Sequence, residues 1–147
     1  MDIEWKLKKF DELSAGELYR ILQLRSQVFV VEQQCVYLDT DDKDQPCYHL
    51  AGLLENRLLA YTRIVPPGVI YEEASIGRVV TAFTVRRLGT GKLLMEHSIK
   101  AVYSLFGKVP VKIGAQFYLR EFYESFGFKQ TSAIYLEDNI EHIYMIL

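Results

Sequence analysis

The centre of the chain reads Ile76-Gly77-Arg78-Val79-Val80-Thr81-Ala82-Phe83-Thr84-Val85, followed by Arg86-Arg87-Leu88-Gly89-Thr90-Gly91. The first run is apolar and β-branched, which predicts a strand, and the second is basic and carries two glycines. A helical pattern then runs from Lys92 to Phe106. This order of strand, glycine loop and helix favours phosphate binding. Glycines let successive N–H groups turn into one concavity, and the helix start adds unpaired N–H donors.

The glycine spacing narrows the kind of phosphate loop. A Walker loop requires Gly-x-x-x-x-Gly-Lys-Ser/Thr, and a dinucleotide-binding turn requires Gly-x-Gly-x-x-Gly. The segment from Arg86 to Gly91 instead reads Arg-x-x-Gly-x-Gly. Taken alone, it fits an ordinary strand-to-helix turn equally well, so a second motif has to decide.

The composition indicates a single globular domain over residues 1–147. Half of the residues are hydrophobic and 13% are aromatic, so the chain can bury a sizeable core. The net charge of −2 argues against nucleic acid as the main partner. The start lacks a secretory signal, and no apolar run is long enough to span a membrane. We therefore expect a cytoplasmic protein that does not bind membranes.

Hydrophobic periodicity predicts the remaining elements. A strand begins at Ile3, and a helix follows with Ser14 as N-cap and Glu17 at the capping-box position. The apolar run Val28 to Val31 is either a second short helix or a buried connector. Further strands are expected over 48–54, 58–65, 109–115, 131–136 and 140–147, with a short helix over 117–126. This order predicts a mixed α/β sheet with helices on its faces.

An acidic segment lies between the first helix and the hairpin, and it contains Asp39, Asp41, Asp42 and Asp44. It is either a solvated turn or an acidic rim that attracts a cationic amine. It lacks the glycine and glutamate of a calcium loop, so no metal is expected. Cys35 and Cys47 match no zinc spacing and are expected to be reduced thiols in small apolar spaces.

The second motif lies near the end of the chain, where Gln116 closes a predicted strand and Tyr123 precedes Gly127-Phe128. Together with the glycine loop, it resembles the GNAT family of N-acetyltransferases, in particular the ElaA-like branch. The resemblance implies a mixed, mostly antiparallel sheet of six to seven strands flanked by about four helices. It also rests on Leu24-Arg25, Val28-Phe29-Val30-Val31-Glu32-Gln33, Ile76-Gly77-Arg78-Val79, Gly114-Ala115-Gln116 and His142-Ile143.

The resemblance implies an acyl-CoA-dependent N-acetyltransferase with acetyl-CoA as cosubstrate and no metal. A primary amine, on a small molecule or a peptide, would attack the thioester directly. A homodimer is compatible with this function. The alternative is a regulatory or interaction module that binds CoA without turnover.

The resemblance also implies the residues that hold the cosubstrate. Backbone N–H groups of the glycine loop would bind the pyrophosphate. The strand edge would pair with the pantetheine and stabilise the oxyanion, and Gln116 stands where many relatives have Asn. Tyr123 would be the general acid, although a core aromatic is the alternative interpretation. The implied cosubstrate-binding residues are Val79, Val80, Thr81, Arg86, Arg87, Leu88, Gly89, Thr90, Gly91, Lys92, Gln116 and Tyr123.

A general base should remove the proton of the amine, because a lysine-like amine is mostly charged near pH 7. Glu73 or Glu32 is the predicted base, with His49 and His142 as further candidates. The residues expected to face the acceptor are Glu32, His49, Arg78 and His142. Arg78 is unusual in a central strand, and we expect it to pair with a carboxylate such as Glu32.

Overall fold

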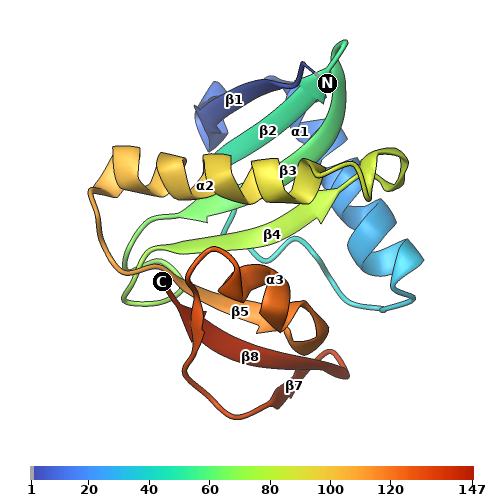
Figure 1. The fold of residues 1–147 in the computed structure, drawn as a ribbon. Coiled ribbons are helices and arrows are strands. Elements are labelled where there is room, and N and C mark those ends of the chain that lie inside the picture. Colours follow the sequence, from blue (N-terminus) through green and yellow to red (C-terminus); the bar gives the residue numbers. More distant parts are fainter. Residues whose placement is uncertain (1) are drawn as a thin grey trace.

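The structure, a computed structural model, describes residues 2–147 and contains two four-stranded sheets (Figure 1). The first sheet is antiparallel, in the order β1-β2-β3-β4. In the second sheet β8 lies between β5 and β6 and also pairs with β7. The strands are β1 Glu4–Lys9, β2 Tyr48–Leu54, β3 Arg57–Val65, β4 Ser75–Thr81, β5 Lys112–Gln116, β6 Lys129–Gln130, β7 Tyr135–Glu137 and β8 Ile140–Ile146.

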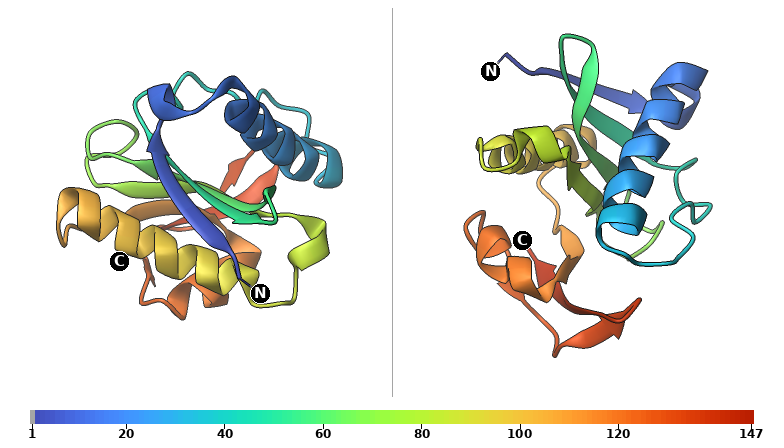
Figure 2. Two further views of the ribbon diagram at one scale, coloured as in Figure 1. Left: turned by 90° about the horizontal axis from the view of Figure 1, so that it is seen from above. Right: turned by 90° about the vertical axis from the view of Figure 1, so that its right-hand side faces the viewer.

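The two long helices cover opposite faces of the first sheet (Figure 2). On one face, α1 (Ala15–Arg25) buries Ile21 and Leu24 against Tyr61 of β3 and Val80 of β4. On the other, α2 (Thr90–Phe106) packs with the main core, which continues to α3 (Arg120–Glu124) and the second sheet. Within residues 2–147, no helix is long and apolar enough to cross a membrane.

Local sequence signals determine where α1 begins. The Ser14 hydroxyl accepts a hydrogen bond from the Glu17 amide at 3.0 Å, and the Glu17 carboxylate accepts one from the Ser14 amide at 2.8 Å. This reciprocal pair satisfies two amides at the start of the helix, as the capping-box pattern predicts. The chain then continues into a π-helical turn, Ser26–Glu32, so the helical interpretation of Val28 to Val31 is confirmed.

A β-bulge shapes β4. Tyr61 pairs with Val80 and Arg63 pairs with Gly77, so Arg78 and Val79 both lie opposite one residue of β3. Arg78 has a φ of +51°, in the left-handed region. A bulge bends its strand and increases the local twist, which turns the outer edge of β4 away from the second sheet.

The two sheets meet only at one end of this edge. Within residues 2–147, the pairing between them is a single parallel bridge between Ala74 and Val111. From that bridge β4 and β5 diverge (Figure 1). The outer edge of β4 beyond the bulge therefore has no neighbouring strand in the described chain.

The predicted class of fold is confirmed, and several boundaries are corrected. Within residues 2–147 the sheet is divided into two, with eight strands in place of six to seven. Three α-helices and the π-helical turn stand where about four helices were expected. β4 ends at Thr81, because the chain turns through a 3-10 helix, Phe83–Val85, to reach α2. Of the strand predicted over 131–136, only Tyr135 and Leu136 lie in a strand, β7, and β5 begins at Lys112.

Candidate active site

A cleft of about 730 Å³ opens where β4 and β5 diverge. Residues 76–81 of β4 form one wall and residues 113–116 of β5 form the opposite wall. The segment from Val28 to Asp41 and the β7–β8 hairpin contribute the remaining sides. The cleft therefore joins both sheets, and its β4 wall is the unpaired strand edge that includes Val79, Val80 and Thr81.

The glycine loop lies beyond the end of β4 and presents a group of free backbone donors. Gly89 is the N-cap of α2 and has a φ of +80°, a conformation that favours glycine. The amides of residues 87–92 donate no hydrogen bond to the described chain, and the first paired amide is that of Leu93. The buried Thr90 hydroxyl also lacks a partner within residues 2–147. Unpaired donors at the start of a long helix fit a phosphate or pyrophosphate.

The three basic side chains of this region, those of Arg86, Arg87 and Lys92, differ in their contacts. Arg86 lines the cleft, but its Nη2 lies 2.7 Å from the Glu32 carboxylate and 3.2 Å from the Thr81 carbonyl. Arg87 and Lys92 are exposed. The predicted pair between Arg78 and Glu32 is therefore wrong, since Glu32 pairs with Arg86.

Tyr123 lies on α3 and lines the cleft with a residue exposure of 6%. Its ring packs edge-on against Phe122 and Phe128. Its hydroxyl makes no hydrogen bond with any described residue. Burial raises the pKa of Tyr123, so the phenol keeps its proton. Both predicted properties, a packed aromatic and a proton donor that faces the cleft, are compatible with this position.

Gln116 and His142 lie side by side where β5 pairs with β8, and both line the cleft. Gln116 Nε2 lies 3.5 Å from the Gln33 side-chain oxygen. His142 Nδ1 lies 2.8 Å from the Ile140 carbonyl, which accepts the Nδ1–H. Nε2 then carries the lone pair of the neutral ring, and it lies 3.5 Å from the Glu137 carboxylate.

The other two candidate bases lie outside the cleft. His49 is 1% exposed, with Nε2 2.9 Å from the Asp44 carbonyl and Nδ1 2.6 Å from the Tyr61 hydroxyl. Burial lowers its pKa, which keeps this ring neutral in the core. Glu73 precedes β4 at the bridged end, next to Ala74. Of the four predicted candidates, the structure brings Glu32 and His142 to the cleft.

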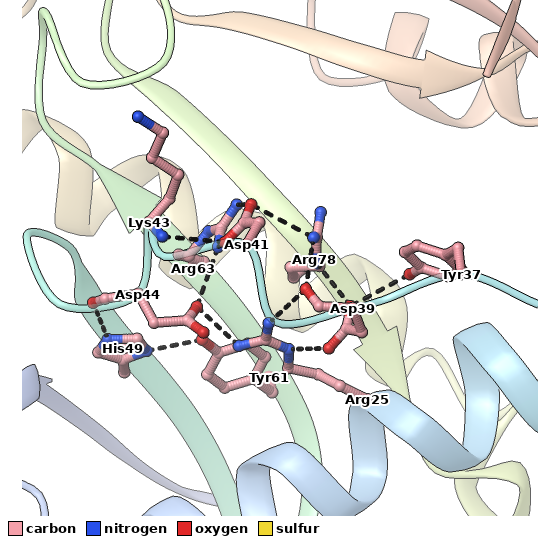
Figure 3. Close-up of polar contacts among 10 residues, drawn as sticks. All are labelled: Arg25, Tyr37, Asp39, Asp41, Lys43, Asp44, His49, Tyr61, Arg63 and Arg78. Carbon is pink, nitrogen blue, oxygen red and sulfur yellow. Dashed lines mark hydrogen bonds and ion pairs between the residues drawn. The ribbon is translucent and has the colours of Figure 1, made fainter. Parts of the chain in front are cut away.

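The acidic segment is neither a solvated turn nor an open acidic rim. Asp39 and Asp44 are buried, 6% and 5% exposed, and together with Asp41 they pair with three arginines (Figure 3). These six side chains form what we call the arginine–aspartate cluster: Arg25, Asp39, Asp41, Asp44, Arg63 and Arg78. The sequence interpretation missed it because its members are brought together only by the tertiary fold.

The cluster extends to the cleft through Tyr37, Asp41 and Arg78, which also line it. The Tyr37 hydroxyl donates to the Asp39 carboxylate at 3.1 Å, and burial raises the pKa of Tyr37. Burial alone would raise the pKa of Asp41, but hydrogen bonds from Arg63 outweigh it and lower that pKa to about 2. Asp41 therefore remains ionised, and the cluster connects the cleft wall to α1 and β3. No sequence signal identified Tyr37 or Glu137 as cleft residues.

Comparisons with known proteins agree with this geometry. The family described as acetyltransferase (GNAT) domain matches residues 44–147. The chain is 40% identical to protein ElaA of Escherichia coli, over 97% of this chain and 95% of that protein. The crystal structure of Escherichia coli ElaA superposes with a TM-score of 0.93 and 39% identity, covering 99% of both chains.

Two further solved structures extend the comparison. An acyl-CoA N-acyltransferase from Pseudomonas aeruginosa is 39% identical, covers 99% of both chains and gives a TM-score of 0.95. An aminoglycoside 6′-N-acetyltransferase, solved with coenzyme A, is 16% identical and gives a TM-score of 0.71, covering 97% of this chain and 96% of that chain. The second of these shares the fold and shows that a protein of this fold binds coenzyme A.

Proposed function

The chain belongs to the GNAT acetyltransferase family, in its ElaA-like branch, and on this premise we propose that it transfers an acetyl group from acetyl-CoA to a primary amine. The observation that supports this most directly is that free donors lie both in the cleft and beyond the end of β4. The unpaired edge of β4 and Tyr123 line the cleft, and the amides of residues 87–92, which follow β4 in the chain, make no hydrogen bond with the described residues. Acetyl-CoA, when bound, supplies a thioester that an amine can attack.

The loop and strand would hold the cosubstrate in two ways. The amides of residues 87–92, the Thr90 hydroxyl and the positive end of α2 suit the pyrophosphate. The free edge of Val79 to Thr81 can pair with an extended amide chain as an added strand does. Arg86 and Gln116 line the same cleft and can add side-chain contacts.

The same strand edge and Tyr123 would serve the chemical step. An N–H of the β4 edge can stabilise negative charge on the thioester oxygen, an effect of about 2.7–4 kcal/mol per donor in well-studied enzymes. Tyr123 can donate its proton to the leaving sulfur, because burial keeps the phenol protonated. These roles require no metal from the described chain.

The amine must lose a proton before it attacks. Its charged form predominates near pH 7, and neutralising a lysine-like amine costs about 4.6 kcal/mol. His142 is the better base of the two cleft candidates, since its Nδ1–H donates to Ile140 and its Nε2 lone pair remains available. The Glu32 carboxylate is already occupied by its ion pair with Arg86.

The test is calorimetric titration of the purified protein with acetyl-CoA, CoA, ATP and NAD, followed by an amine library with a free-thiol readout. We expect acetyl-CoA and CoA to bind and at least one amine to release thiol. Binding of CoA without transfer to any amine would indicate the regulatory module. Absence of CoA binding would overturn the proposal.

A further inference from the structure

The three arginines of the arginine–aspartate cluster differ in how many of their nitrogens contact the aspartates (Figure 3). Arg25 is 0% exposed, and all three of its nitrogens donate to Asp39 or Asp44. Arg63 is 2% exposed, and both its terminal nitrogens donate to Asp41 or Asp44. The terminal nitrogens of these two arginines are therefore occupied inside the protein.

Arg78 differs because one of its terminal nitrogens is free. Its Nε lies 2.8 Å from Asp39 Oδ1, and its Nη2 donates to the Asp39 carbonyl at 2.8 Å and to Asp41 at 3.3 Å. Nη1 makes no hydrogen bond with any described residue and points away from the cluster (Figure 3). The side chain is 23% exposed and lines the cleft. The cluster therefore presents one arginine edge to whatever occupies the cleft.

This arginine is held in place before a ligand arrives. Arg78 is a bulge residue of β4 with a left-handed backbone conformation. Two nitrogens of its guanidinium contact Asp39 and Asp41, which fixes the group in place. A pre-oriented guanidinium loses little conformational entropy when it binds an anion, and its planar N–H groups match a carboxylate. The donors suited to pyrophosphate are at the far end of β4, so Arg78 is available to another anionic group.

We propose that Arg78 Nη1 binds a carboxylate carried by the acceptor amine, so that the substrate class is an amino acid or a related amino carboxylate. Another side of the cleft, the β7–β8 hairpin, carries Glu137 and Asp138 beside His142, which suits the positive amine end of the same molecule. This inference rests on the proposed acetyl transfer. Within that reaction, Arg78 determines specificity by orienting the acceptor.

The test measures binding of matched ligands to the CoA-loaded protein by calorimetry. Each pair differs only in the carboxylate, for example phenylalanine against phenethylamine and 4-aminobutyrate against propylamine. We expect the carboxylate member to bind roughly 10- to 100-fold more tightly, the range for a hydrogen bond to a charged group. Arg78→Gln should remove this difference, Arg78→Lys should keep part of it, and Arg57→Gln, an exposed arginine on β3, should leave it unchanged.

The outcomes separate this inference from the proposed function. CoA titration comes first, and its failure with the wild-type protein refutes the proposed function itself. If CoA binds but neither member of any pair binds, or both bind equally, the Arg78 assignment is wrong. The same holds if Arg78→Gln retains CoA binding and also the full preference. A comparison of succinyl-CoA with butyryl-CoA completes the test. If the protein prefers the succinyl donor and Arg78→Gln loses that preference, Arg78 binds a carboxylate of the acyl group, and the acceptor assignment is overturned.

Discussion

Tyr123 combines a packed ring with a hydroxyl that has no partner in the described chain. Replacing it by Phe removes one oxygen and leaves the packing intact. Because the leaving sulfur then lacks its proton donor, we expect kcat to fall about 10²-fold or more. The affinity for CoA should change little, and stopped assays of thiol release together with calorimetry measure both quantities.

The matched control is Tyr19→Phe, since Tyr19 is 69% exposed on α1 and does not line the cleft. It should leave both quantities unchanged. A Tyr123→Phe protein with wild-type kcat would show that another group, or water, protonates the sulfur.

Arg25 is the residue on which the arginine–aspartate cluster most depends, because its side chain is 0% exposed and contacts both Asp39 and Asp44. Arg25→Ala would leave these buried carboxylates with fewer partners. Breaking a buried pair in this way costs about 3–5 kcal/mol in the free energy of unfolding. Urea denaturation measures the loss, and Arg57→Ala on the exposed start of β3 should change stability by less than about 0.5 kcal/mol. A loss below about 1 kcal/mol for Arg25→Ala would contradict this account.

At the scale of single residues, local pairs could be predicted from the sequence and distant pairs could not. Ser14 and Glu17 are three positions apart, so helix geometry alone brings them together. Arg78 contacts Asp39 and Asp41 across 39 and 37 positions, and nothing in the sequence favoured them over Glu32. The role of Tyr123 was identified from a motif, not from its chemistry, because ten tyrosines are present.

Among the elements, α1 gives the clearest test of local stabilisation. Ser14→Ala removes the side chain that accepts from the Glu17 amide, so we expect a loss of about 1 kcal/mol in the free energy of unfolding. Ser14→Asp keeps an acceptor at the N-cap and should retain most of the stability. Urea denaturation of both variants measures their free energies of unfolding. An unchanged midpoint for Ser14→Ala would mean that tertiary packing alone determines this end of α1.

Elements with a strong periodic pattern were predicted well, and elements defined by pairing were not. The α2 pattern ends at Gly107, which has a φ of +83° and donates to the Tyr103 carbonyl, as a helix-ending glycine should. β4 stops at Thr81 although the apolar run continues to Val85, because the chain turns into the 3-10 helix Phe83–Val85. The strand predicted over 131–136 begins only at Tyr135, because the chain leaves β8 between β6 and β7.

For the whole molecule, the division into two sheets is the feature that creates the site. The order of strands and helices along the chain could be predicted from the hydrophobic pattern. The divergence of β4 from β5 could not, because it follows from the bulge at Arg78 and Val79 and from a single bridge at Ala74. Resemblance to a family implied a strand edge that pairs with the cosubstrate. Only tertiary contacts show that the bulge residue is held by Asp39 and Asp41.

The same cluster predicts how the molecule responds to acid. The pKa of Asp41 is about 2 in the folded protein against an ordinary value of 3.8, and that of Asp44 is lowered as well. A carboxyl with a lowered folded pKa contributes stability above its unfolded pKa and loses it as the pH falls. The free energy of unfolding should therefore decrease between about pH 4 and pH 2.

His49, whose pKa burial lowers, adds a further loss of stability as the pH falls, and this loss begins near the ordinary histidine pKa of 6.5. Asp41→Asn should flatten the acid limb and leave the His49 limb unchanged, as denaturation at a series of pH values would show. Parallel curves for both proteins would contradict the cluster's role.

A ligand in the cleft contacts both sheets, so it should stabilise the molecule as one unit. CoA at 100 times its dissociation constant adds about 2.7 kcal/mol by mass action, which corresponds to a rise in Tm of roughly 5–10 °C for a chain of this size. Hydrogen exchange shows which amides are protected when CoA binds. Because β4 and β5 form opposite walls of the cleft, amides on both sides of it should exchange more slowly with CoA bound. Protection confined to the loop of residues 87–92 would mean that CoA contacts its pyrophosphate site but does not extend between the sheets.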